Sequence, residues 1–200
     1  MLILLTWLLV LVSPISLSME PSLLPGLTTR AYQETVTFQL RDFINNWDDQ
    51  SPCDVLEAVE GYLDQGADPN ISVRGGMPLL IVIINDIHSL YPVSDAKKYK
   101  NIDDFRVFQA NMVEKLLIYE ANPNGFFTRG HGVNVSVLYM AITMRLPRVV
   151  KTLLDYGADP KNEPVRILLD HKKKKDYVTD PVGKEMVAII DSFTHKIKIF

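Results

Sequence analysis

The residue types that most often carry out chemistry are present in this sequence, but their spacing does not bring them together. The four histidines and the single cysteine are His88, His131, His171, His195 and Cys53. A zinc or nucleophilic site needs pairs or close groups of such residues, and none of these spacings provides one. We therefore expect no metal, no cofactor and no catalytic residue. With one cysteine, no intramolecular disulfide can form.

Paired carboxylates and glycine pairs are better explained by structure than by chemistry. Asp48-Asp49 and Asp103-Asp104 each lie near the expected start of a helix, where negative charge is favoured by the helix dipole. Gly75-Gly76 and the pair Gly130 and Gly132 lack the preceding strand and the following lysine of a phosphate-binding loop. We interpret the carboxylates as helix-start residues and the glycines as turn residues.

The charge of the chain argues against a nucleic-acid partner. The 21 basic and 24 acidic residues give a net charge of −3 and are spread along the sequence. Proteins that bind nucleic acid usually gather basic residues on one face. Four consecutive lysines at 172–175 are followed directly by Asp176. A solvated surface explains this run better than contact with acidic lipid or nucleic acid.

Aromatic and arginine side chains point instead to recognition of another protein. Two adjacent phenylalanines and an arginine fall in a polar segment that has no core of its own. Such side chains commonly supply most of the binding energy of an interface. The predicted partner-binding residues are Arg74, Tyr91, Tyr99, Phe126, Phe127 and Arg129. The alternative is that Phe126 and Phe127 pack on Ile71 and Val73 of a neighbouring segment.

The same helix ending occurs three times in the chain. The endings are Gly66-Ala67-Asp68-Pro69, Glu120-Ala121-Asn122-Pro123 and Gly157-Ala158-Asp159-Pro160. A valine three and four residues before an apolar pair precedes each ending, which marks one buried helix face. Glycine closes a helix in the left-handed conformation, aspartate or asparagine forms a side-chain turn, and proline cannot continue the helix. A glutamate in the first position predicts either a strained cap or a different ending.

With these endings the sequence resembles the ankyrin repeat family, whose repeat ends in a Val-x-x-Leu-Leu helix and Gly-Ala-Asp. The family's Thr-Pro-Leu-His opening is retained in part at Met77-Pro78-Leu79-Leu80 and at Ser136-Val137-Leu138-Tyr139. The endings lie 54 and 37 residues apart (120 − 66 and 157 − 120). The family period is about 33 residues, so insertions of about 21 and 4 residues are required. The resemblance implies an all-α repeat, an ankyrin-like solenoid of helix-turn-helix units with short hairpin fingers.

Apolar periodicity locates the helices of these units. We expect helices at 33–46, 52–65, 79–84, 103–119, 137–144 and 147–156. A further helix is expected to begin at Glu163-Pro164-Val165, and the apolar column recurs around 186–190, at Met186, Ile189 and Ile190. The helix at 79–84 is apolar on every side and is expected to be fully buried. The helix that begins at 103 is expected to be one or two turns longer than is usual in the family. Ser136 is expected to cap the helix that follows it.

The first 18 residues look like a secretory signal peptide. An uncharged apolar run of about 11 to 12 residues ends at Ser13-Pro14, and small residues follow at cleavage spacing. This run is shorter than the roughly 20 residues that span a bilayer. We expect cleavage after Ser18, a mature chain that begins at Met19, and export to a secreted or periplasmic location. An uncleaved segment would instead anchor the chain in a membrane.

The sequence therefore divides into a signal peptide (1–18), an irregular leader (19–32) and an ankyrin-repeat-like domain (33–200). Within the domain we expect four units: 33–69, 70–123 with an insertion at 88–102, 124–160, and a cap at 161–200. The resemblance implies a monomeric, non-enzymatic module that binds an unidentified protein through its fingers and first helices. Neither nucleic acid nor, after cleavage, a membrane is an expected partner. The alternatives are an enzyme or enzyme inhibitor that uses the insertion, and a membrane-tethered scaffold.

Overall fold

The computed structural model describes residues 29–46, 52–85, 102–161, 165 and 180–196. This part of the chain is mostly helical and carries two small strand pairs. Its α-helices are α1 (Thr29–Asn45), α2 (Pro52–Asp64), α3 (Leu79–Asn85), α4 (Ile102–Ile118), α5 (Val137–Thr143), α6 (Pro147–Asp155) and α8 (Pro181–Lys196). The first hairpin joins β1 (Ser72–Val73) to β2 (Met77–Pro78) through η3 (Arg74–Gly76). The second joins β3 (Phe126–Arg129) to β4 (Val133–Ser136) through η6 (Gly130–Gly132).

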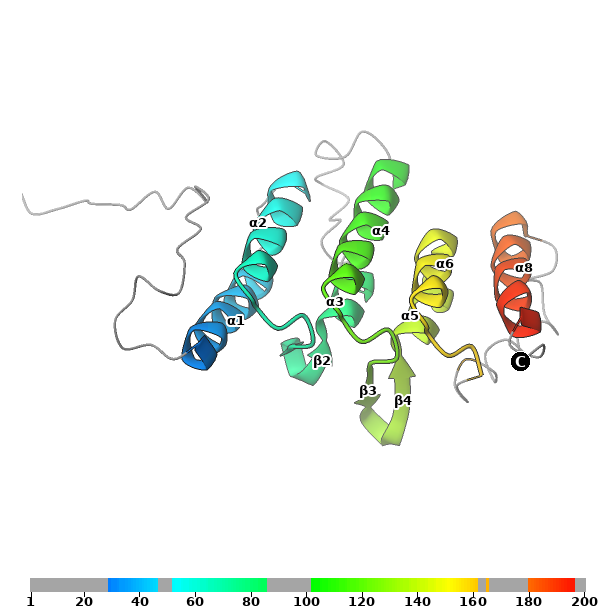
Figure 1. Cartoon of the computed structure of the whole chain (residues 1–200). Coiled ribbons are helices and arrows are strands. Elements are labelled where there is room, and N and C mark those ends of the chain that lie inside the picture. Colours follow the sequence, from blue (N-terminus) through cyan, green and yellow to red (C-terminus); the bar gives the residue numbers. More distant parts are fainter. Residues whose placement is uncertain (1–28, 47–51, 86–101, 162–164, 166–179, 197–200) are drawn as a thin grey trace, which may run out of the picture.

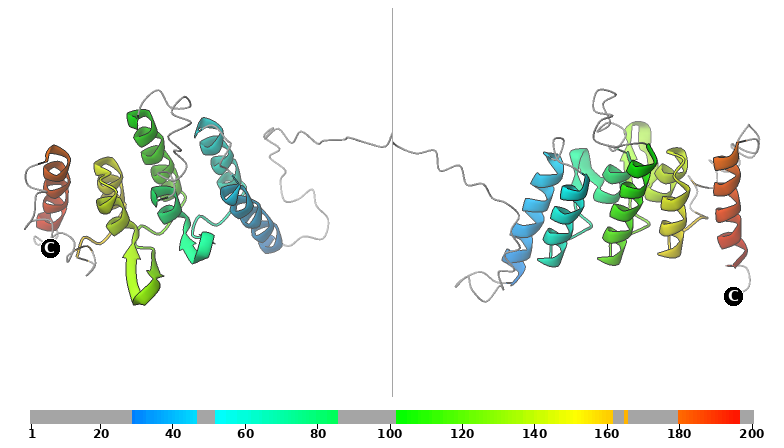
Figure 2. Two further views of the ribbon diagram at one scale, coloured as in Figure 1. Left: turned by 180° about the vertical axis from the view of Figure 1, so that it is seen from behind. Right: turned by 90° about the horizontal axis from the view of Figure 1, so that it is seen from above.

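The helices follow one another across the molecule in chain order, from α1 and α2 at one side to α8 at the other (Figure 1). The view from above shows α2, α4, α6 and α8 side by side (Figure 2). The short helices α3 and α5 pack against each other, and they pack against α4 and α6 respectively. Both hairpins project from the same end of the helices (Figure 1). The molecule thus has a helical body and one edge formed by hairpins.

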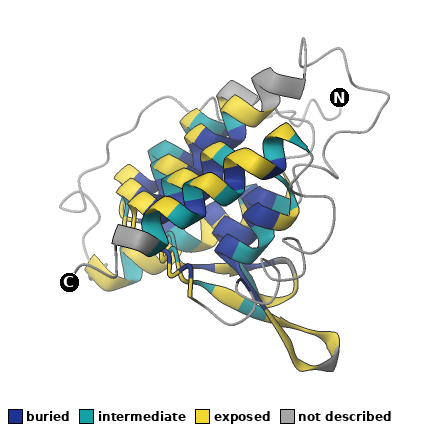
Figure 3. Cartoon of the chain, turned by 90° about the vertical axis from the view of Figure 1, so that its right-hand side faces the viewer, coloured by how far each residue is buried: buried dark blue, intermediate teal, exposed yellow. Residues whose placement is uncertain are grey.

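The core lies between the helices, where Figure 3 shows the buried residues. Every residue of α3 from Leu79 to Ile84 is buried, as the uninterrupted apolar sequence predicts. A helix that is buried on all sides needs neighbours on all sides. It receives them from α4, α5 and the first hairpin. In α6 the buried residues are Val149, Val150, Leu153 and Leu154, the apolar stripe predicted from the sequence.

The three helix endings adopt the same hydrogen-bonded cap. At the end of α2 the N–H of Gly66 donates to Leu63 O (2.9 Å) and the N–H of Ala67 donates to Tyr62 O (3.0 Å). The same two bonds recur at Glu120 and Ala121 after α4, and at Gly157 and Ala158 after α6. Glu120 has φ of +66°, beside +90° and +88° for the two glycines. Of the two endings that the sequence allowed here, the left-handed and strained one is present.

Replacing Glu120 by glycine is therefore expected to stabilise the chain. Glycine removes the Cβ clash of the left-handed residue but adds entropy to the unfolded chain, so the net gain should be about 0.5–1 kcal/mol. The Glu120 side chain is exposed, and the backbone bonds of the cap stay in place. Chemical denaturation measures the difference. Gly157→Ala is the matched control and should be destabilising, because alanine is strained at a φ of +88°. No atom lies within 4 Å of the added Cβ, so the strain comes from the backbone conformation and not from a clash with neighbours. Loss in the control without gain at Glu120 would contradict this explanation.

Asparagine side chains connect each helix ending to the next one. Asn70 Nδ2 donates to Glu120 O (3.2 Å), and Asn70 Oδ1 accepts from the backbone N–H of Asn122 (2.7 Å). The same two bonds recur between the second and third endings, where Asn124 Nδ2 donates to Gly157 O (3.0 Å) and Asn124 Oδ1 accepts from Asp159 N–H (2.7 Å). The side-chain amide fits this task because one end donates while the other accepts. Neighbouring endings are thereby held at a fixed spacing.

The two ends of this series have different partners. At the first ending the backbone N–H of Asp68 donates to Thr37 Oγ1 of α1 (2.9 Å), which takes the place of an asparagine from a preceding ending. At the third ending Lys161 occupies the position of Asn70 and Asn124. A lysine side chain has no acceptor atom and cannot make the paired bonds. In the described residues, the side-chain bonds to the endings therefore begin at Thr37 of α1, and Lys161 cannot make the bonds that Asn70 and Asn124 make.

Polar side chains also join neighbouring helices. Lys115 Nζ of α4 lies 2.5 Å from Glu60 Oε1 of α2. One helical turn further, the hydroxyl of Tyr119 donates to Asp64, and this hydrogen bond together with burial raises the pKa of Tyr119 to about 12. At the other side of the molecule, Arg145 forms an ion pair with Asp180 at the start of α8.

The observed helices match the predicted ones with two corrections. At the C-terminal side, α8 (Pro181–Lys196) extends beyond the predicted 186–190 in both directions. The other correction is at the N-terminal side. α1 begins at Thr29, so residues 29–32 form its first turn and the leader predicted at 19–32 is too long. Apolar periodicity could not reveal this turn, because it is held by exposed polar contacts such as the Arg30–Glu34 pair (3.0 Å). α4 covers the predicted range 103–119 to within one residue at each end and has 17 residues, against 13 in α2 and 9 in α6. Ser136 caps α5 as predicted, with Oγ accepting from Tyr139 N–H (3.2 Å).

Several predicted segments lie outside the described residues. They include the signal peptide at 1–18, leader residues 19–28, the insertion from 88 to 101, and most of the cap after 161.

Candidate protein-binding surface

The second hairpin carries the predicted aromatic and arginine residues. Its register pairs Phe126 with Ser136, Phe127 with Val135, Thr128 with Asn134 and Arg129 with Val133. Side chains alternate between the two faces of a strand. Phe126 and Thr128 therefore share one face, and Phe127 and Arg129 share the other. The predicted group is divided between opposite faces of the hairpin.

The two phenylalanines have different surroundings. Phe127 is partly buried and packs against the hydrophobic core, next to its strand partner Val135, which is 4% exposed. The side chain of Phe126 is 58% exposed, and Arg129 is exposed as well. The alternative, in which both rings pack on Ile71 and Val73, does not hold for the exposed Phe126; Phe127 packs against the core cluster that includes these two residues. A large apolar ring at the surface of a hairpin is a candidate contact for a partner.

A pocket of about 240 Å³ lies between the bases of the two hairpins, beside Phe126. Besides this ring and the first residues of α3, its lining includes Pro69, Pro78, Asn70, Asn122 and Asn124. None of the lining residues is charged. This volume lies just below the range of about 300–1,000 Å³ that is usual for small-molecule sites.

The three pocket asparagines are not equivalent. Asn70 and Asn124 use both ends of their amides in the bonds between endings. Asn122 Oδ1 accepts from the backbone N–H of Asn124 (2.9 Å), which fixes the orientation of its amide. Its Nδ2 has no acceptor among the described residues. At the pocket, Asn122 Nδ2 is thus a donor without an acceptor in the described part of the chain, and the exposed side chain can donate to water.

Asn122 also differs from the residues at its position in the other two endings, which are aspartates. Asp68 Oδ1 accepts from Asn70 N–H (2.8 Å) and Asp159 Oδ1 accepts from Lys161 N–H (2.8 Å), so all three residues make the same local turn. The pocket thus has a neutral amide where the other endings have a carboxylate.

The remaining predicted contact residues do not line this pocket. Arg74 lies in η3 at the tip of the first hairpin, and its side chain is outside the described part of the chain. Tyr91 and Tyr99 fall within 86–101, also outside it. Of the residues that line the pocket, sequence reasoning named Phe126 and did not name the asparagines. The available signal was a repeated asparagine: Asn70 comes two positions after Asp68, and Asn124 comes two positions after Asn122.

Within the described residues no group of three or more histidine, cysteine, aspartate or glutamate side chains is arranged to hold a metal ion. In the same part of the chain, none of the helices combines the length and the apolar character needed to cross a bilayer.

Comparisons of the chain with models of protein families, with curated proteins and with solved structures found no match.

Proposed function

We propose that this chain is an exported ankyrin-repeat protein, an all-α solenoid that binds another protein through its two hairpins and the pocket between them. Three features support this architecture. The helix endings after α2, α4 and α6 share one cap, asparagine bonds run from each ending to the next, and the hairpins project from one end of the helices (Figure 1). In this description the hairpins are the fingers of the repeats.

The observation that carries the binding proposal is the exposed ring of Phe126 at the pocket. Burying such a ring against a partner removes a large apolar area from water, and aromatic residues are enriched among the side chains that dominate interfaces. The pocket beside it can accept a side chain of the partner, and its lining of proline, leucine, asparagine and phenylalanine offers both apolar surface and hydrogen-bonding groups. Protein recognition is the function that these features support best.

Phe126→Ala is expected to weaken partner binding by about 2 kcal/mol, or roughly 30-fold in Kd, without changing the melting temperature. Phe127→Ala is the matched control: the same truncation one residue away should lower the melting temperature, because Phe127 packs against the core. Both variants are compared with the wild-type chain in thermal melts and in affinity capture from the compartment that the protein reaches. Arg129→Ala, on the face opposite Phe126, shows whether both faces bind. Undiminished capture by Phe126→Ala would remove this ring from the proposed interface.

Export is a separate part of the proposal and rests on the apolar N-terminal run. We expect the exported chain to begin at or near Met19, with Met1 to Ser18 removed. Intact-mass measurement of the protein recovered outside the cytoplasm tests this directly. A chain that keeps its first 18 residues would favour the membrane-tethered scaffold instead.

A further inference from the structure

We propose that Asn134 is the attachment site of an N-linked glycan in the exported chain, and that Asn70 stays unmodified in the folded protein. Both residues begin the acceptor motif for this modification, an asparagine followed two positions later by serine or threonine, without proline between them. The motif occurs in the sequence at Asn70-Ile71-Ser72 and at Asn134-Val135-Ser136. The inference rests on the export that the proposed function includes, because this modification belongs to secreted chains.

The modification forms a bond between the amide nitrogen Nδ2 and the anomeric carbon of an oligosaccharide. The oligosaccharide comes from a lipid diphosphate carrier. Its bond to the carrier breaks, and the lipid diphosphate leaves while the amide loses one proton. The product is a planar secondary amide, in which the new substituent lies on the same side as the oxygen, as in a trans peptide bond. A suitable asparagine must therefore have open space at this position of its Nδ2.

Asn70 does not meet this condition in the folded chain. Its Nδ2 donates to Glu120 O (3.2 Å) while its Oδ1 accepts from Asn122 N–H (2.7 Å). Because both partners belong to one short segment, the donated hydrogen is the one on the same side of the amide as Oδ1. A sugar would replace this hydrogen and force the two helix endings apart. A chain modified at Asn70 would thus lose the contact that joins its first and second endings.

Asn134 meets the condition. It lies in β4 of the second hairpin, which projects from the helical body, and it is exposed (Figure 1). Thr128 Oγ1 donates to Asn134 Oδ1 (2.9 Å), and no described residue accepts from Asn134 Nδ2. The secondary amide keeps its oxygen as an acceptor for Thr128. The sugar would therefore extend into solvent without displacing a hydrogen bond of the described residues.

The fold selects between the two sites after the sugar has been added. Ser136, the last residue of the second motif, is 4% exposed and caps α5. The transfer needs an accessible motif, so it must precede the folding of this hairpin. A chain that is modified at Asn134 can still form the observed structure, whereas one modified at Asn70 cannot. We therefore expect any chains modified at Asn70 to remain in the cell.

A glycan at Asn134 leaves the pocket between the hairpins open. Asn134 lies opposite Thr128, so its side chain is on the same face of the hairpin as Phe126. The pocket, however, is on the side of β3 next to the first hairpin, and β4 is the strand farther from that hairpin (Figure 1). None of the described residues that line the pocket belongs to β4. The glycan would thus border the proposed binding surface on its outer side.

The test uses the full chain with its own first 18 residues, expressed in cultured animal cells and recovered from the medium. Intact mass is measured before and after enzymatic removal of N-linked glycans, which turns each modified asparagine into aspartate and so marks the site for peptide mapping. We expect a glycan on Asn134 and none on Asn70 in the wild-type chain. Asn134→Gln should abolish the mass difference completely.

Ser72→Ala is the matched control. It destroys the first motif but keeps the Asn70 amide, and Ser72 is exposed in β1, so the variant should fold and be exported like the wild type. The mass difference should be unchanged in this variant. Ser136→Ala is not an equivalent control for the second motif, because it would also remove the cap of α5.

The outcomes separate this inference from the proposed function. Exported wild-type chain with an unmodified Asn134 would overturn the inference and leave both export and protein binding in place. A glycan on Asn70 in the exported chain would also overturn it, since the bonds between the endings would then not exclude the sugar. A chain that stays in the cytoplasm would count against the inference and against export.

Discussion

Leu153→Ala is expected to lower the free energy of unfolding by about 2–5 kcal/mol, the range found when a buried leucine is truncated and its cavity only partly closes. Leu153 is fully buried and Leu154 is 5% exposed, so Leu154→Ala should fall in the same range. Folded domains are usually stable by only about 5–15 kcal/mol, which makes this a large fraction of the total.

The position of α6 explains why the loss should extend beyond this helix. It packs against α4, α5 and α8, so a cavity beneath Leu153 weakens contacts to elements on both sides. Chemical denaturation gives the change in stability, and amide hydrogen exchange should show faster opening in α4 and α8 as well as in α6. If the repeat architecture is right, each unit depends on its neighbours in this way.

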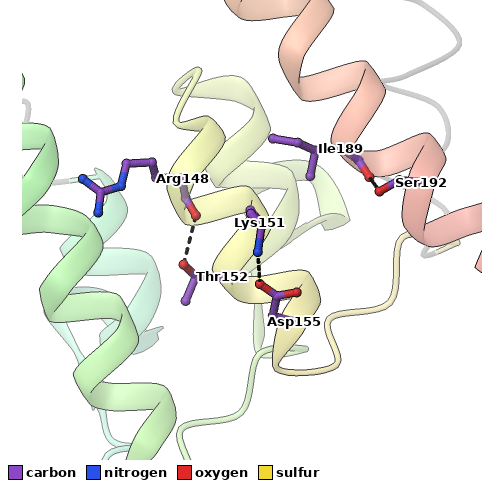
Figure 4. A network of polar contacts seen from close by, with 6 residues as sticks. All are labelled: Arg148, Lys151, Thr152, Asp155, Ile189 and Ser192. Carbon is purple, nitrogen blue, oxygen red and sulfur yellow. Dashed lines mark hydrogen bonds and ion pairs between the residues drawn. The ribbon is translucent and has the colours of Figure 1, made fainter.

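Lys151→Ala provides the matched control in the same helix. Lys151 and Asp155 form a surface pair at 2.5 Å, with side chains 60% and 43% exposed (Figure 4). Exposed pairs of this kind contribute about 0–1 kcal/mol, so the control should remain close to the wild type. A Leu153→Ala variant as stable as Lys151→Ala would mean that the packing of Leu153 in the core does not contribute to stability as its burial indicates.

The helices could be predicted because their signals are local. The apolar run from Leu79 to Ile84 contains no polar residue, and it forms a helix buried throughout. The stripe around Leu153 and Leu154 has helical spacing and faces the core. The cap chemistry of Gly66 and Gly157 needs only the residues next to it, so the ends of α2 and α6 were predictable to within about a residue or two.

The bonds between endings could not be predicted in the same way. Asn70 and Asn122 are 52 residues apart, and their contact depends on how two helix endings stack in space. In the sequence an asparagine after proline predicts only a local turn.

The placement of Phe126 on one face of the hairpin and of Phe127 and Arg129 on the other could not be predicted either. Which side chains share a face depends on strand boundaries and register, which composition does not reveal.

A second feature that sequence reasoning missed is the buried side chain of Gln109 in α4. It is 1% exposed, and its Nε2 donates to Ile83 O (3.2 Å) and Ile84 O (3.0 Å) in the last turn of α3. The final carbonyls of a helix have no partner within it and need one from elsewhere when they are buried. Gln109 supplies that partner where α3 ends at Asn85, directly before the segment at 86–101.

Gln109→Leu is expected to destabilise the chain by about 2–4 kcal/mol. Leucine has a similar size and good helix propensity, so the main change is the loss of the donor, and each buried carbonyl left without a partner costs about 1–3 kcal/mol. Chemical denaturation measures the loss, and amide exchange should rise first in α3, whose last turn loses its cap. Asn111→Ala, at an exposed position of the same helix, should stay within about 0.5 kcal/mol of the wild type. Equal or greater stability of Gln109→Leu would show that burial of leucine outweighs the two hydrogen bonds at this site.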